Sequence, residues 1–410
     1  MKKKIALLIA ILMLMSIFAA CAAPAAPAQP APTPGGDTAA PDDAEDLGYI
    51  IIGNIQDISG PTSVWGQSYQ WGAEYAAAKI NAAGGVLGRN IRIITYDLRG
   101  NDVNEGINAY NRLAQVDGAV AAMVMASNVG IVLAPLSDEV GLPMVHSAMD
   151  ERATTRPDGT PYQFMFLTQL SAPQQGRMMG MFAMNELGVT RAAVLYDNSN
   201  AYATTHIYGG SGGFLEFWEA NGGEIVAIEA FDGVTDRDYR ALLGVIQAAN
   251  PEVLFISSFV QQNAIAYQQA RAMGLDIPII GNNSFFIPFA DVTEGRATNV
   301  YFPSNMNYQD PVVSDFVAAR IAERGMEPSN HFFFGYDNVH IIVDAINRAG
   351  TTDRVAVAAA LSQTTDIVGW TGSITINPET HRPTGLEKWI TRVEGFEYVP
   401  IMAFAMGDDD

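Results

Sequence analysis

From Tyr49 onward, short apolar runs alternate with longer runs that have helical spacing, and this alternation limits the folds open to the chain. Four strand-like runs come first, at residues 49–55, 91–97, 119–125 and 142–148. A second series follows, at residues 192–197, 224–231, 253–259 and 277–281. Helical segments separate the strands, at residues 66–83, 103–116, 131–140, 173–187, 214–220, 239–249 and 262–273. Strands that alternate with helices predict parallel sheets covered on both faces. The two series therefore predict an α/β protein with two similar, Rossmann-like lobes.

The C-terminal part breaks this rhythm. Helical patterns come first, at residues 311–324, 337–349 and 355–361, and strand patterns follow at 373–377 and 388–394. We expect both strands to extend existing sheets rather than to form a third domain. A chain that crosses between lobes more than once forms a hinge, and the cleft between the lobes is the natural ligand site. The expected lobes are 49–170 with 306–372, and 171–305 with 373–405, followed by an acidic tail at 406–410.

The N-terminal region has the pattern of an export signal. Three lysines precede an apolar run from Ile5 to Phe18, and two alanines then lead to Cys21. The run is shorter than the roughly 20 residues of a spanning helix. The segment 18–21 resembles the lipobox of bacterial lipoproteins, with Phe18 in place of the usual leucine. We therefore expect a signal peptide at 1–20, lipidation at Cys21 and a Pro/Ala-rich stalk over 21–48. An ordinary secretory peptide or an uncleaved anchor remains an alternative.

Composition and motifs exclude several classes of function. The formal net charge of −21 opposes binding to nucleic acids. Cys21 is the single cysteine, so no disulfide within the chain is possible. The five histidines show no metal-binding spacing, and GGSGG at 209–213 lacks the lysine of a phosphate-binding loop. No nucleophile–base signature is visible, so we expect neither an enzyme nor a cofactor or metal.

The segment 58–97 closely resembles the opening of the leucine/isoleucine/valine-type periplasmic binding proteins, the type I solute receptors of ABC transporters. Its hallmarks are Ser59-Gly60-Pro61, Gly66, Gly72, Ile80-Asn81, Gly84-Gly85 and Tyr96-Asp97, with further echoes at Ser127, Gly222-Gly223, residues 268–275 and Gly335-Tyr336-Asp337. The resemblance implies two lobes joined by a three-stranded hinge. It also implies a monomeric extracytoplasmic receptor that delivers a small ligand to an ABC permease. The expected ligand is a branched-chain or other apolar amino acid, and a ligand-sensing subunit of a signalling system is the alternative.

The resemblance also implies ligand-binding residues. Trp65 matches an aromatic cover, Ser127 a hydroxyl for the ligand carboxylate, and Ala148 a backbone carbonyl. Aromatic walls are implied at Tyr202, with Tyr208 as a competitor, and at Phe259 and Tyr336. Each has a structural alternative: Ser127 could cap a helix, and Tyr336 could pack in the core.

Two positions depart from the family pattern. Asp150 stands where a threonine is usual, and Asn283 is neutral where an acidic residue normally takes the ligand ammonium. If Asp150 supplies the missing charge, a zwitterion or cation fits; we favour this interpretation. If Asp150 instead pairs with Arg152 or Arg156, an amide or an aromatic or aliphatic carboxylate fits better. A polyamine is a further alternative ligand.

Overall fold

The computed structural model describes residues 48–209 and 212–406. The predicted signal peptide, Cys21, the stalk up to residue 47 and the end of the acidic tail lie outside the described residues. Within this part of the chain, no helix is both long and apolar enough to cross a membrane. The described residues all belong to one compact unit.

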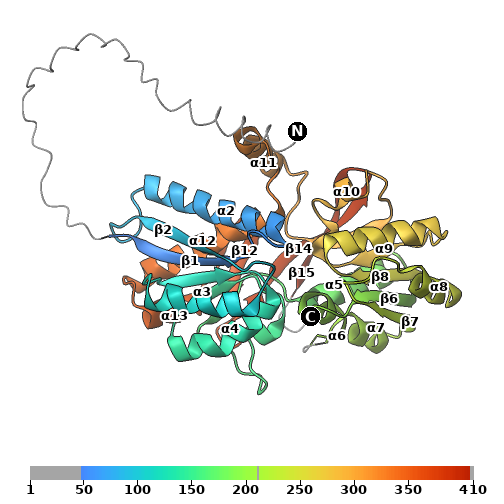
Figure 1. Ribbon diagram of the computed structural model, residues 1–410, viewed down its shortest axis with the longest axis horizontal. Coiled ribbons are helices and arrows are strands. Elements are labelled where there is room, and N and C mark those ends of the chain that lie inside the picture. Colours follow the sequence, from blue (N-terminus) through green and yellow to red (C-terminus); the bar gives the residue numbers. More distant parts are fainter. Residues whose placement is uncertain (1–47, 210–211, 407–410) are drawn as a thin grey trace, which may run out of the picture. The chain divides into compact units, whose positions relative to one another are not determined.

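The first lobe is built on a five-stranded parallel sheet in the order β2-β1-β3-β4-β5. Its strands are β1 (Ile50–Gln56), β2 (Ile91–Asp97), β3 (Ala121–Val124), β4 (Met144–His146) and β5 (Met165–Leu167). Its helices are α2 (Ser63–Ala82), α3 (Val103–Gln115), α4 (Ser127–Val140), η1 (Glu151–Ala153), α11 (Pro311–Arg324), α12 (Asn330–Ala349) and α13 (Arg354–Leu361). The helices α2 and α12 lie on one side of this sheet, and α3 and α4 lie on the other (Figure 1). Both sides are covered, as the apolar strands require.

The second lobe repeats this strand order. Its sheet runs β15-β14-β10-β9-β8-β6-β7, and the last five strands are parallel in the same relative order as those of the first lobe. The strands are β6 (Arg191–Asp197), β7 (Glu224–Phe231), β8 (Val253–Ser257), β9 (Ile279–Gly281), β10 (Val300–Ser304), β14 (Leu386–Glu394) and β15 (Glu397–Met406). The helices are α5 (Ala172–Asn185), α6 (Ala201–Tyr208), α7 (Phe214–Ala220), α8 (Arg240–Ala248), α9 (Val260–Ala272), η2 (Asn283–Phe285) and α10 (Phe289–Val292). The prediction of two similar α/β lobes is confirmed.

One prediction about the C-terminal strands is wrong. The predicted strand 388–394 falls within β14 and pairs antiparallel with β10. The predicted strand 373–377 corresponds to β12 (Gly372–Ile376), which joins neither large sheet. It pairs antiparallel with β11 (Ile367–Gly369) and β13 (Pro383–Thr384) in a small sheet of its own. This sheet is tied to the first lobe by hydrogen bonds from Ile376 N to Thr364 O and from Leu167 N to His381 O.

Three connections join the lobes: β5 to α5, β10 to α11, and β13 to β14. These crossings form the expected three-stranded hinge. Two of the glycines singled out in the sequence allow α2 and α12 to pack closely. A Cβ atom added to Gly72 would lie 1.8 Å from Phe332 O, and one added to Gly335 would lie 2.1 Å from Tyr69 O, so any larger residue would clash. Glycine at both positions lets the backbones of α2 and α12 touch. This contact places the first turns of α12 beside residues 69–72 of α2.

Candidate functional site

A cavity of about 310 Å³ lies between the lobes, at the carboxyl ends of both parallel sheets. In each sheet the strand order reverses between two neighbours, β1 and β3 in the first lobe and β6 and β8 in the second. Ligands of open α/β sheets bind at such a switch point, because the loops there diverge and leave a crevice. Here the two crevices face each other. The loops that line the cavity follow β1, β2, β3, β4 and β5 on one side and β6, β8 and β9 on the other.

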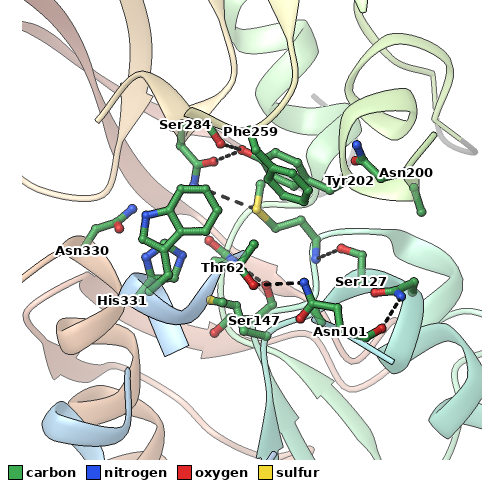
Figure 2. Close-up of a pocket in the computed structure, with 18 of the residues that line it drawn as sticks. Thr62, Asn101, Ser127, Ser147, Asn200, Tyr202, Phe259, Ser284, Asn330 and His331 are labelled. Carbon is green, nitrogen blue, oxygen red and sulfur yellow. Dashed lines mark hydrogen bonds between the residues drawn. The ribbon is translucent and has the colours of Figure 1, made fainter. Parts of the chain in front are cut away.

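The two walls of the cavity come from different lobes. Figure 2 shows Thr62, Asn101, Ser127 and Ser147 on one side, facing Tyr202, Phe259 and Ser284 on the other, with Asn330 and His331 at one end. Further lining residues are Trp65, Gly100, Met125, Ala126, Asn128, Met149, Gln169, Ser199, Asn200, Ala201, Asn283, Phe286 and Ile287. The walls are therefore a mixture of aromatic or sulfur-containing surface and neutral polar groups.

Trp65 connects the two lobes. It lies in the first turn of α2 and is buried, but its side chain packs with the core of the second lobe. Its ring centre is 5.8 Å from that of Phe259 and 5.4 Å from that of His331, on which it stacks. Burial lowers the pKa of His331 to about 3, so the imidazole is neutral at neutral pH. Trp65 thus forms an apolar side of the cavity with a neutral histidine behind it.

Ser127 is the first residue of α4 and does not cap this helix, so the capping role considered as its alternative is wrong. The N-cap position itself is Ala126, which has no side-chain oxygen to cap the first turn. Ser127 Oγ accepts a hydrogen bond from Met149 N at 3.2 Å. The serine therefore lies where free helical N–H groups and a hydroxyl meet the cavity, an arrangement suited to a ligand oxygen.

Tyr202 and Phe259 form the aromatic wall of the second lobe. Their rings stack, with centres 5.4 Å apart and planes 5° from parallel. The Tyr202 hydroxyl donates to Asn283 Oδ1 and lies 2.8 Å from Ser284 Oγ. Burial raises the pKa of Tyr202 far above its ordinary value, so the phenol stays neutral. Tyr208, the competitor for this position, is half exposed and donates to Tyr196 instead.

Three of the eight residues implied by the resemblance do not line the cavity. Ala148 is fully buried between the lining residues Ser147 and Met149, and its Cβ faces Gly130. Tyr336 lies on α12 and packs against Tyr75 and His340. The remaining five, Trp65, Ser127, Tyr202, Phe259 and Asn283, are brought together.

Asp150 is the third residue away from the cavity. Its carboxylate accepts from Arg152 N at 3.0 Å, Nε at 2.9 Å and Nη2 at 2.6 Å, and from Thr205 Oγ1 of the other lobe at 2.7 Å. The partner is thus Arg152, one of the two surface arginines considered as alternatives. Asp150 is not positioned as the counter-charge for a ligand amine.

The sequence did not reveal several residues of the cavity. Asn101, Gln169 and His331 are polar residues without a motif, and their proximity depends on which strand ends are adjacent. The sequence offered one signal for such residues, which is their position relative to the predicted strands. Polar residues directly after a buried strand, such as Asn101 after 91–97, lie at the carboxyl edge of the sheet, where ligands bind.

Comparisons with known proteins identify the family. A family model described as "Periplasmic binding protein" matches residues 50–395. The Leu/Ile/Val-binding protein homolog 3 of Brucella melitensis is 25% identical, over 80% of this chain and 86% of that protein. The branched-chain amino acid transporter substrate-binding protein of Streptococcus pneumoniae, solved with isoleucine, has a TM-score of 0.75 at 22% identity, covering 88% of this chain and all of that one.

A solute-binding protein of an ABC transporter from Rhodopseudomonas palustris, solved with 3,4-dihydroxybenzoic acid, is similar to the same degree. Its TM-score is 0.74 at 21% identity, over 88% of this chain and 98% of that chain. At these identities the structural likeness shows the shared fold, while the family match covers nearly all of the body. The chain belongs to the type I periplasmic binding proteins, the extracytoplasmic solute-binding receptors of ABC transporters.

Proposed function

We propose that the chain captures one small organic solute, with an apolar body and a carboxylate, in the cavity between its lobes and delivers it to an ABC permease. The observation that carries this proposal is the cavity itself. It is built from the switch-point loops of both lobes, so a bound solute contacts both. A ligand that touches both lobes binds the closed form more tightly than the open form, and its binding shifts the equilibrium toward closure.

We assign ligand contacts to four residues and a positioning role to a fifth. Ser127 and the N–H groups at the start of α4 would hold the carboxylate. Trp65, Tyr202 and Phe259 would enclose the apolar body, and Asn283 would orient Tyr202 through the hydrogen bond between them. Named relatives bind amino acids, and structural neighbours were solved with isoleucine or an aromatic acid. A carboxylate is common to both kinds of ligand.

We also propose that lipidated Cys21 and the following stalk tether the receptor to the membrane that holds the permease. The order of charged, apolar and small residues before Cys21 supports this tether. A tether raises the local concentration of the receptor near its permease.

Cross-linking in native membranes tests delivery to a permease. The receptor is acidic, so a carbodiimide would join its surface carboxylates to lysines of a partner. We expect peptides of an ABC permease with the tagged full-length chain, and fewer with Cys21→Ser. A sensor kinase or chemoreceptor in their place would favour the sensing alternative, and recovery of neither would contradict delivery.

A further inference from the structure

The cavity contains no ionised side chain at neutral pH. None of its lining residues, all within the described part of the chain, is an aspartate, glutamate, lysine or arginine. The titratable groups among them are His331 and Tyr202, and both are neutral as described above. A charged group on the ligand therefore finds no counter-charge among the lining side chains.

The buried carboxylates on segments next to the cavity include Asp57, Asp197 and Asp150, and each of these three accepts hydrogen bonds from protein donors. Asp57 accepts from the backbone N–H groups of Gly60, Thr62 and Gly100 and from the Thr62 hydroxyl, at 2.7–2.9 Å. Asp197 is the last residue of β6, at the carboxyl edge of the second sheet. It accepts from four neighbours: Ser199, Asn200, Gly233 and Ser258.

The third is Asp150, held by Arg152 and Thr205. These carboxylates fix the loops that shape the cavity. Their oxygens are engaged within the protein, so an ammonium group in the cavity would lack an anionic acceptor. An unpaired buried charge is costly, and such a ligand would be disfavoured.

The backbone favours a negative charge instead. The helices α4, α6 and α12 begin at the lining residues Ser127, Ala201 and Asn330, and α2 begins directly after the lining residue Thr62. The start of a helix carries a partial positive charge, which attracts a carboxylate and repels an ammonium. Ser127 adds a donor, since its oxygen already accepts from Met149 and its hydrogen has no acceptor among the described residues.

Two lining residues, Gln169 and Asn101, carry buried acceptor atoms that lack a donor among the described residues. Gln169 is only 2% exposed; its Nε2 donates to Ser147 O, and its Oε1 has no hydrogen-bond partner within the part of the chain that the structure describes. Asn101 repeats this pattern, with Nδ2 donating to Thr62 Oγ1 and Oδ1 unpartnered. A buried acceptor without a donor is unfavourable, and a neutral O–H on the ligand would satisfy it without adding a charge.

From these features we propose that the ligand is a hydroxylated carboxylic acid without an amine, on an aliphatic or aromatic body. The proposal rests on the proposed function and specifies its ligand class. The carboxylate binds at Ser127 and the start of α4. A ligand hydroxyl donates to Gln169 Oε1, and the apolar body packs between Trp65 and Phe259.

Calorimetric titration with matched ligands tests this class on the wild-type chain, after unfolding and refolding to remove any bound solute. One set compares L-leucine, 2-hydroxy-4-methylpentanoate and 4-methylpentanoate, which differ only in an amine, a hydroxyl or a hydrogen. A second set compares phenylalanine, 3-phenyllactate and 3-phenylpropionate, and a third compares benzoate with 4-hydroxybenzoate. In at least one set, we expect the hydroxylated acid to bind at least about 10-fold more tightly than the plain acid of the same set. We also expect it to bind at least about 10-fold more tightly than either amino acid of the panel.

Two glutamine variants provide a matched pair. Gln169→Leu removes the acceptor in the cavity, so the advantage of the hydroxylated acid over the plain acid should disappear. Gln175→Leu removes a glutamine that is equally buried and also has an unpartnered Oε1, but that does not line the cavity. It should leave the advantage within about twofold of wild type.

Tighter binding of an amino acid than of every hydroxylated acid would overturn the proposed ligand class and leave the receptor function in place. An advantage of the hydroxylated acid that survives Gln169→Leu would overturn the role of Gln169. Failure of the whole panel to bind would also overturn the ligand class, and a thermal-shift screen with a wider range of solutes would then test the receptor function separately.

Discussion

Replacing Asp150 with alanine separates a structural role from a ligand-binding role. The carboxylate is 1% exposed and joins a loop of the first lobe to α6 of the second through Thr205. Its other partner, the Arg152 side chain, is 65% exposed and can return to water when the carboxylate is removed. We therefore predict a loss of stability from Asp150→Ala, with little change in which solutes bind.

The size of the loss follows from the two partners. The pair with the exposed arginine contributes about 0.5 kcal/mol, because solvent screens it. The buried hydrogen bond from Thr205 to a carboxylate contributes about 2 kcal/mol. The expected loss is thus about 2.5 kcal/mol. For roughly 360 ordered residues, an unfolding entropy of about 2.1 cal/mol/K per residue converts this loss into a fall in Tm of about 3 °C.

Scanning calorimetry of wild type, Asp150→Ala, Thr205→Val and the double variant measures this loss. Thr205→Val should lower Tm by about 2.6 °C, and the double variant should lie close to Asp150→Ala, because both changes remove the same hydrogen bond. A Tm shift below about 1 °C for Asp150→Ala, together with loss of amino-acid binding, would refute this reasoning. Asp150 would then be the counter-charge of the ligand.

Further predictions concern buried titratable groups and the tether. Burial lowers the pKa of His206 to about 4, so the unfolded chain binds the extra proton below pH 6.5, and the free energy of unfolding falls as pH falls toward 4. His206→Gln should lessen this fall by about 1.4 kcal/mol per pH unit in acid unfolding experiments, and identical slopes in both proteins would contradict a neutral histidine. Burial, partly offset by Asp337, lowers the pKa of Lys388 to about 7, so stability should rise by about 1.4 kcal/mol per pH unit between pH 7.5 and 9.5. In urea titrations Lys388→Met should lack this rise; a rise that persists would assign it to another group. Cys21→Ser should move the chain from the membrane fraction to the soluble fraction, as immunoblotting would detect, and retention would exclude a lipid tether.

The alternation of strands and helices was sufficient to predict both lobes, because each periodicity reports directly which face of an element is buried. It missed β5 and β10, strands of three and five residues, and also β15, which is ten residues long. It also misplaced β12, since an apolar strand carries no signal for which neighbour it pairs with. Pairing is decided by tertiary contacts, here with β11 and β13.

The site was predicted where a local motif marks it. Trp65 and Ser127 follow recognisable strand ends, and both line the cavity. Asp150 shows the limit of this reasoning. Its position in the sequence suggested a ligand contact, but the direction of its side chain depends on Arg152, two residues away, and on Thr205, fifty-five residues away. A long-range partner of this kind cannot be inferred from spacing along one chain.

A thermal-shift screen of the refolded wild-type chain tests the central claim, solute capture between the lobes, most directly. The panel holds amino acids, hydroxy acids, plain carboxylic acids, amides and polyamines, each applied to wild type and to Trp65→Ala. A solute at 100 times its Kd stabilises the folded form by about 2.7 kcal/mol, which corresponds to a rise in Tm of about 3.5 °C. We predict such a rise for at least one carboxylate with wild type and a much smaller rise with Trp65→Ala. No rise with any solute, or equal rises in both proteins, would contradict binding in this cavity.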